Sequence, residues 1–280
     1  MKARALTLAV ALSAAVATGA ASGATITNET GLWPFDGFDW AQGGTAYTQG
    51  FEGTDGDLFT LSYFAVATAL VTEGQNYVPT GLDTIANGAP GPVPLTGDAY
   101  EYTIVASLNE QVQTCTPEAG GNTSCEFNVL DGTFSIYYDP TPDANSTAGS
   151  LGTGFQGGDS ILIISGTVLP LAGQTFDTTT GSNSTTLQGI VTFTNNLYVN
   201  PDLLGTTFTS TLQLGAAQTS YVDPGGFNGT PWAGLQGPGD IVFQADANQS
   251  FTERTVPEPM SLALIGLGLG AAGWSLRRRS

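Results

Sequence analysis

The fold is decided by stretches such as Gly132-Thr133-Phe134-Ser135-Ile136-Tyr137-Tyr138-Asp139, in which aromatic and β-branched side chains alternate with small polar ones. Alternation with a period of two residues is typical of a strand that buries one face. The strand predicted from it covers residues 126–138, and the turn sequence Asp139-Pro140-Thr141-Pro142 follows directly. This part of the chain therefore indicates β-structure.

Similar patterns occur along most of the chain. Charged residues make up only 11% of the sequence, whereas Gly, Ser, Thr, Asn and Pro are plentiful, which favours strands and turns over helices. One segment is ambiguous, because Ala65, Ala67 and Ala69 would also suit a helix, but its period-two placement favours a strand. Besides 126–138, the predicted strands cover 58–71, 100–108, 160–169, 187–193, 206–214 and 241–244. We expect an all-β fold, a single β-sandwich or jelly-roll-like domain over residues 25–255.

Aromatic residues are concentrated near the start of this domain. Flat rings among glycines and aspartates can stack on sugar rings, but they can equally enter the core as the first strands of the domain. We favour the core. The residues concerned are Trp33, Phe35, Phe38, Trp40, Tyr47 and Phe51.

Cys115 and Cys125 are the only cysteines, and glycines lie between them. In an oxidising compartment such a pair predicts a disulfide that closes a hairpin-like loop. Zinc is disfavoured, because the chain has no histidine to complete a tetrahedral ligand set.

Both ends of the sequence carry apolar segments. Lys2 and Arg4 precede an apolar stretch and then small residues up to Ala24, which predicts a secretory signal peptide at residues 1–24. A second apolar run, 260–276, would be about 25 Å long as a helix, close to the minimum for crossing a bilayer. It predicts a transmembrane helix with its basic end in the cytoplasm. The run is flanked by Val256, Pro257, Glu258 and Pro259 on one side and by Arg277, Arg278 and Arg279 on the other.

The segment 256–280, with its Val-Pro-Glu-Pro sequence, apolar span and arginines, resembles the PEP-CTERM sorting signal of exopolysaccharide-producing Gram-negative bacteria. The resemblance implies recognition by an exosortase, a membrane-embedded protease or transpeptidase that removes the tail. It also implies passage through the inner membrane to the cell surface or extracellular matrix. The alternative is an uncleaved tail anchor.

Three further segments, 100–106, 132–139 and 158–168, resemble the flocculation-associated PEP-CTERM proteins. This resemblance implies a matrix role, in which the protein works with extracellular polysaccharide to hold cells together in flocs or biofilm.

Charge and composition exclude several functions. Residues 25–255 contain 23 acidic residues and a single basic one, Arg254, so the exported part carries a net charge of about −22. Nucleic acid is excluded as a partner, because its binding depends on Lys and Arg. The absence of histidine removes Ser-His-Asp and Cys-His catalysis. Two carboxylates alone can still cleave glycosides.

Two groups of oxygen ligands raise the question of calcium. Asp55 and Asp57 form one group, and Asp139, Asp143 and Asn145 form the other. Neither follows the EF-hand pattern, and Asp beside Gly or Pro usually stabilises turns, so we expect no metal site. The sequence thus predicts a non-catalytic, exported surface or matrix protein. The alternatives are a carbohydrate-binding module and a two-carboxylate glycosidase.

Overall fold

The computed structural model describes residues 23–84, 99–117, 123–144, 158–177, 183–217 and 241–252. Within these ranges the regular secondary structure consists of β-strands, and none of it forms an apolar helix that could cross a bilayer. The predicted signal peptide lies outside the described residues except at its last two positions, and the whole predicted sorting segment, 256–280, lies outside them.

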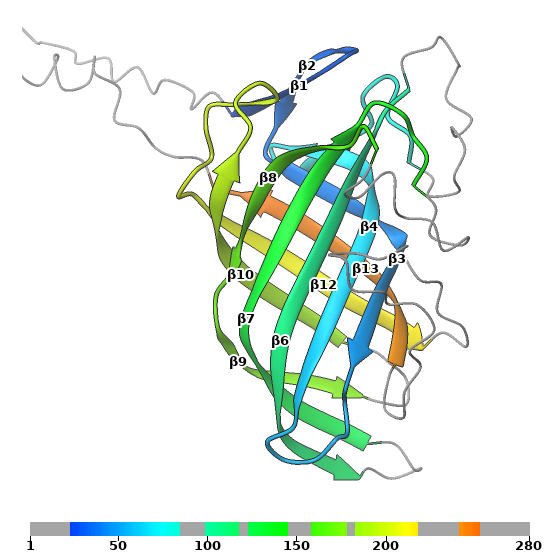
Figure 1. Ribbon diagram of the computed structural model, residues 1–280, viewed down its shortest axis with the longest axis vertical. Coiled ribbons are helices and arrows are strands. Elements are labelled where there is room, and N and C mark those ends of the chain that lie inside the picture. Colours follow the sequence, from blue (N-terminus) through cyan, green and yellow to red (C-terminus); the bar gives the residue numbers. More distant parts are fainter. Residues whose placement is uncertain are drawn as a thin grey trace, which may run out of the picture.

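Thirteen strands are described (Figure 1). In chain order they are β1 Ala24–Asn28, β2 Gly31–Phe35, β3 Gly37–Gln49, β4 Leu58–Thr72, β5 Gln75–Tyr77, β6 Glu101–Pro117, β7 Thr123–Asp139, β8 Ile161–Val168, β9 Leu171–Asp177, β10 Asn183–Thr194, β11 Val199–Asn200, β12 Thr207–Ala217 and β13 Ile241–Phe251. All seven strands predicted from the sequence are present, as β4, β6, β7, β8, β10, β12 and β13. The structure adds the other six.

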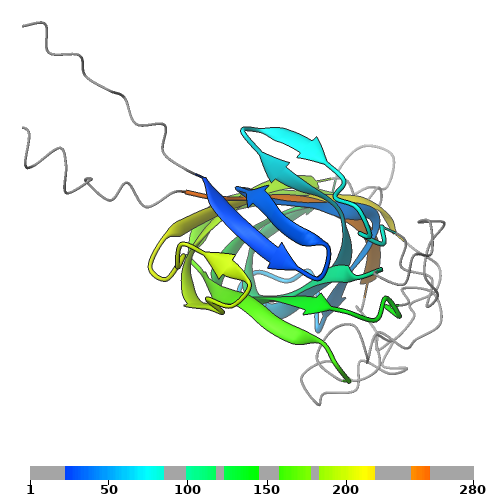
Figure 2. The same cartoon turned by 90° about the horizontal axis from the view of Figure 1, so that it is seen from above.

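The main sheet is antiparallel and closes on itself. Its strand order is β3-β13-β12-β10-β8-β7-β6-β4, and β3 pairs with β4 as well as with β13. Figure 2 shows the strands as a ring, with β1 and β2 lying across one end. In Figure 1, β4, β6, β7 and β8 run in front of β12 (yellow) and β13 (orange), which cross behind them. The all-β, sandwich-like prediction is confirmed, and the β3–β4 pairing additionally makes the sheet a closed barrel.

Alanines on β4 leave room inside the sheet for large rings. Trp40 on β3 is 1% exposed and lies directly opposite Ala67 on β4 and Ala247 on β13. Its ring stacks on Phe38 at a centroid distance of 4.7 Å. Small side chains opposite Trp40 therefore leave room for its ring inside the sheet. This packing explains why alanines recur at every second position in 65–69, the pattern that favoured a strand over a helix at 58–71.

Two glycines let phenylalanine rings lie flat against the inner wall. Gly166 is the cross-strand partner of Phe134, and Gly189 is the partner of Phe208. A Cβ on Gly166 would lie 2.4 Å from the Phe134 ring, and one on Gly189 would lie 2.2 Å from the Phe208 ring. The two rings meet edge to face at 4.4 Å. Covering a strand glycine with an aromatic ring in this way helps to fix the register of the sheet.

A second, smaller apolar cluster lies on the outer face of the sheet. Phe64 and Val66 on β4 and Val105 on β6 belong to it, on the side opposite the main core. Ala144, in the segment after β7, is 1% exposed and packs against the same cluster. The chain that leaves β7 is therefore held against the outside of β4 and β6.

Candidate functional site

The predicted disulfide is present between Cys115 and Cys125. The two residues are direct cross-strand partners on β6 and β7, near the connection between these strands. The hairpin-like loop expected from the cysteine spacing is therefore confirmed, although the intervening residues 118–122 lie outside the described part of the chain.

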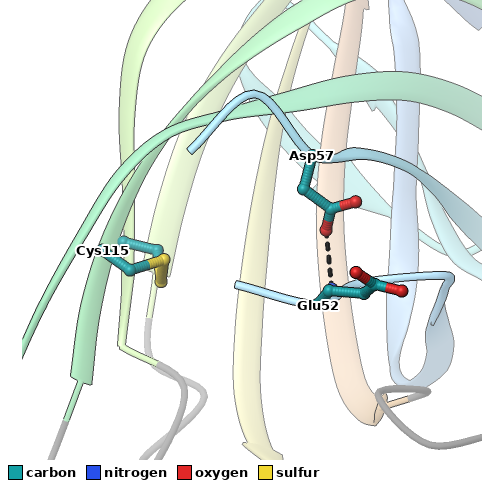
Figure 3. Close-up of a disulfide and its surroundings, with 4 residues drawn as sticks. Glu52, Asp57 and Cys115 are labelled. Carbon is teal, nitrogen blue, oxygen red and sulfur yellow. Dashed lines mark hydrogen bonds between the residues drawn. A yellow bond between two sulfur atoms is a disulfide. The ribbon is translucent and has the colours of Figure 1, made fainter. Parts of the chain in front are cut away.

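The turn between β3 and β4 packs beside this disulfide (Figure 3). The backbone amide of Glu52 donates to Oδ2 of Asp57 at 2.6 Å, which closes the turn. The amide of Gly56 donates to the carbonyl of Val112, and the amide of Val112 donates to the carbonyl of Asp57, at 2.9 and 2.8 Å. Asp57 thus has the turn-stabilising role that the sequence predicts, and the disulfide fastens the strand to which the turn is bound.

Replacing both Cys115 and Cys125 by serine is expected to lower the free energy of unfolding by about 2–3 kcal/mol, the chain-entropy estimate for a loop of this length. Urea unfolding of the oxidised protein and of the double variant measures the difference. The variant should match the wild-type protein under reducing conditions. Equal midpoints for the oxidised protein and the variant would show that β6 and β7 hold this end without the crosslink.

The aromatic residues near the start of the domain belong mostly to the packed core. Phe35, Phe38 and Trp40 are buried in the interior, and Tyr47 is buried in the outer cluster. Phe51 is half-buried against the interior, as is Trp33, whose ring lies 6.4 Å from that of Tyr77. The core interpretation is confirmed for Phe35, Phe38 and Trp40, whereas Tyr47 packs on the outer face and Trp33 and Phe51 are partly buried.

Carboxylates gather at the end of the sheet opposite the disulfide. Glu101 begins β6, Asp139 ends β7, and the two are direct cross-strand partners with exposed fractions of 1% and 0%. Asp143 follows in the segment that returns over the outer face. One carboxylate oxygen from each of these three residues lies within 4.8 Å of the other two.

Backbone amides orient two of these carboxylates. Oε1 of Glu101 accepts from the amides of Ala144 at 2.8 Å and Asp143 at 3.2 Å. Oδ1 of Asp139 accepts from the amide of Thr141 at 2.8 Å. Oε2 of Glu101, Oδ2 of Asp139 and Oδ1 of Asp143 are buried and accept no hydrogen bond. Each carboxylate is therefore left with one oxygen that has no donor.

The surroundings of the cluster disfavour negative charge. Burial, together with the nearby Asp139, raises the pKa of Glu101 to about 8 against the hydrogen bond from Ala144, which lowers it. Burial also raises the pKa of Asp139 to about 7, and the carboxylates of Asp159 and Asp143 act in the same direction. Asp159 is joined to the cluster through the hydroxyl of Thr141, which donates to its Oδ2 at 2.6 Å.

Glu110, also on β6, points into the interior. It is 3% exposed and shares a cavity of about 10 Å³ with Phe59, Phe127 and Phe243. Burial among these rings raises its pKa from 4.5 to about 8, and its Oε2 accepts no hydrogen bond.

A second interior cavity, next to Phe134 and Phe208, has a volume of about 30 Å³. Since a single water needs about 10–15 Å³ by this measure, neither cavity holds a sugar.

The structure tests only part of the sequence-based site predictions. It brings Asp139 and Asp143 together, whereas Asn145 and the sorting residues lie outside the described residues. Asp55 and Asp57 lie in the β3–β4 turn, at the other end of the sheet. Sequence reasoning missed Glu101. Its signal was weak, since the sequence shows Glu101 beside Tyr100 but only the strand register places it directly opposite Asp139.

Comparison with known families finds one match, to the PEP-CTERM protein-sorting motif, at residues 255–279. This match covers the flanking tetrapeptide, the apolar run and the arginines that were singled out from the sequence. No curated protein and no solved structure matches the chain.

Proposed function

Because the chain is a PEP-CTERM protein and hence an exosortase-targeted surface protein of a Gram-negative bacterium, we propose that its β-domain is a non-catalytic component of the extracellular matrix. In this role the domain associates with exopolysaccharide and promotes the aggregation of cells into flocs or biofilm. The sorting motif carries the proposal, since it brings the domain to the outside of the cell.

The interior of the domain supports a structural role. Rings and aliphatic side chains pack there, and the two cavities found among the described residues, of about 10 and 30 Å³, are too small for a saccharide. Contact with a polymer would therefore use the outer surface. That surface belongs to a strongly acidic domain, which repels anionic polymers unless divalent cations lie between them.

The distribution of carboxylates argues against the glycosidase alternative. Catalysis by two carboxylates requires both to flank the scissile bond. The carboxylates with the most strongly raised pKa values, Glu101, Glu110 and Asp139, have exposed fractions of 1%, 3% and 0% and cannot touch a polymer from solution. Incubation of the protein with polysaccharide from its host should release no reducing sugar at any pH.

A deletion strain tests the proposed function. We expect cells that lack the protein to settle more slowly and to retain less polysaccharide in the cell pellet, and we expect the wild-type gene to restore both. Normal aggregation and normal polysaccharide retention in the deletion strain would contradict the matrix role.

The carbohydrate-binding alternative depends on a ring that is free to stack on sugar, and Trp33 beside Tyr77 is the pair to test. A defined glycan site there predicts that Trp33→Ala abolishes binding to the host polysaccharide. The matrix role predicts that co-sedimentation with this polysaccharide is largely retained. Phe193→Ala serves as a control, because Phe193 is an aromatic residue that is 41% exposed and lies on a different strand, β10.

A further inference from the structure

We infer that Glu101, Asp139 and Asp143 form a calcium-binding site, which fastens the segment after β7 to the outer face of the sheet. The site is independent of the proposed matrix role. It differs from the expectation from the sequence, because the ligand that completes it, Glu101, comes from a different strand.

The first support is the pairing of two buried acids. Glu101 and Asp139 face each other directly across β6 and β7, and like charges in this position destabilise a sheet. The described residues contain no Lys, Arg or His, so no basic side chain among them can compensate this charge. A bound divalent cation converts the repulsion into attraction.

The second support is the set of oxygen atoms without donors. Oε2 of Glu101 and Oδ2 of Asp139 belong to side chains that are almost fully buried, and they accept no hydrogen bond. Burying an acceptor without a partner is unfavourable, and more so if the group is charged. Backbone amides of residues 141–144 hold the other oxygen of each carboxylate. This arrangement, one oxygen oriented by a second group and one left for the ion, is common in metal sites.

The third support is the geometry and hardness of the ligands. Calcium binds oxygen at about 2.3–2.6 Å, so two oxygens on opposite sides of one ion are about 5 Å apart. The three carboxylate oxygens lie within 4.8 Å of one another and fit around a single ion. All are hard oxygen ligands, which suit calcium better than zinc, whose structural sites use Cys and His. Calcium takes about six to eight ligands, so water can complete the shell.

The site has a structural consequence. Ala144 lies next to the amides that bind Glu101, and it covers the outer apolar cluster of Phe64, Val66 and Val105. An ion bound to both strands and to Asp143 ties this cover to β6 and β7 at the same point. Binding of the ion should therefore stabilise the whole domain, since only the folded chain brings the three carboxylates together.

Calorimetric titration of the exported, purified protein with CaCl₂ at pH 7.5 tests the inference. We expect one ion per chain, with a dissociation constant of about 10⁻³ M or lower, as in extracellular calcium modules. Thermal unfolding should shift upward in CaCl₂ relative to EDTA. Both effects should be lost in Asp139→Asn and Glu101→Gln, and also in Asp143→Asn, whose half-buried position makes it the variant least disruptive to folding.

Glu110→Gln is the matched control, because Glu110 lies on the same strand and is equally buried but stands outside the cluster. It should bind calcium as the wild-type protein does. A flat titration of the wild-type protein with no thermal shift would overturn the inference and indicate that protons alone neutralise the cluster. Unchanged calcium binding in Asp143→Asn and Glu101→Gln would also overturn it, by locating the ion elsewhere.

Discussion

Replacing Pro257, Glu258 and Pro259 together by alanine is expected to abolish removal of the tail, so that the protein accumulates in the membrane with the tail still attached. Proline fixes its own φ angle and keeps the residue before it extended, which separates the recognised segment from the apolar helix predicted at 260–276. Three alanines would let the helix continue through this segment and would remove the glutamate. Immunoblots of membrane and surface fractions from the native host measure the change.

Pro170→Ala is the control for this experiment, because Pro170 is exposed in the connection between β8 and β9, far from the motif in sequence. It should be processed normally. A second variant, Glu258→Gln, keeps both prolines and tests the charge alone. Normal processing of the triple alanine variant would show that the exosortase recognises another feature of the chain.

Replacing Glu110 by glutamine is expected to stabilise the protein at alkaline pH. The pKa of Glu110 is raised by burial from 4.5 to about 8, so between these pH values the unfolded chain releases the proton and the folded protein retains it. The free energy of unfolding of the wild-type protein therefore falls across this range as the pH rises, by at most about 5 kcal/mol from this residue. Glutamine carries no such proton, so the fall should be absent.

Urea unfolding from pH 4.5 to 9 measures this effect, and the difference between the two profiles isolates Glu110 from the other buried acids. The variant and the wild-type protein should be most alike near pH 4.5 and most different above pH 8. Glu126→Gln, an exposed position on the neighbouring strand β7, should follow the wild-type profile. Parallel profiles for the wild-type protein and Glu110→Gln would mean that water reaches the carboxylate and keeps it ionised.

The sequence predicts strands well where apolar and polar residues alternate, and poorly where pairing determines the structure. β6 was expected to end at residue 108 but continues to Pro117, because β7 pairs with it along its polar half. β13 extends from the predicted 241–244 to Phe251, although alanine at positions 245 and 247 has low strand propensity. β9 is rich in small and polar residues and forms because it pairs with β7.

Closure of the sheet and the carboxylate cluster could not be predicted from the sequence, and the reason is the same for both. Both depend on register between segments: β3 with β4 and β13 for closure, and Glu101 with Asp139 for the cluster. Alternation shows that a strand exists and which residues share a face, but it does not identify the neighbouring strand. The disulfide could be predicted because the sequence contains only two cysteines, so each has a single possible partner within the chain.

The most direct test of the account is mass spectrometry of both ends of the protein as it occurs in its native host, with and without the exosortase gene. We expect a surface or released form that begins near residue 25 and lacks 260–280, and we expect retention of 260–280 when the exosortase is absent. Recovery of the chain from the cytosol with residues 1–24 and 260–280 both intact would contradict this expectation.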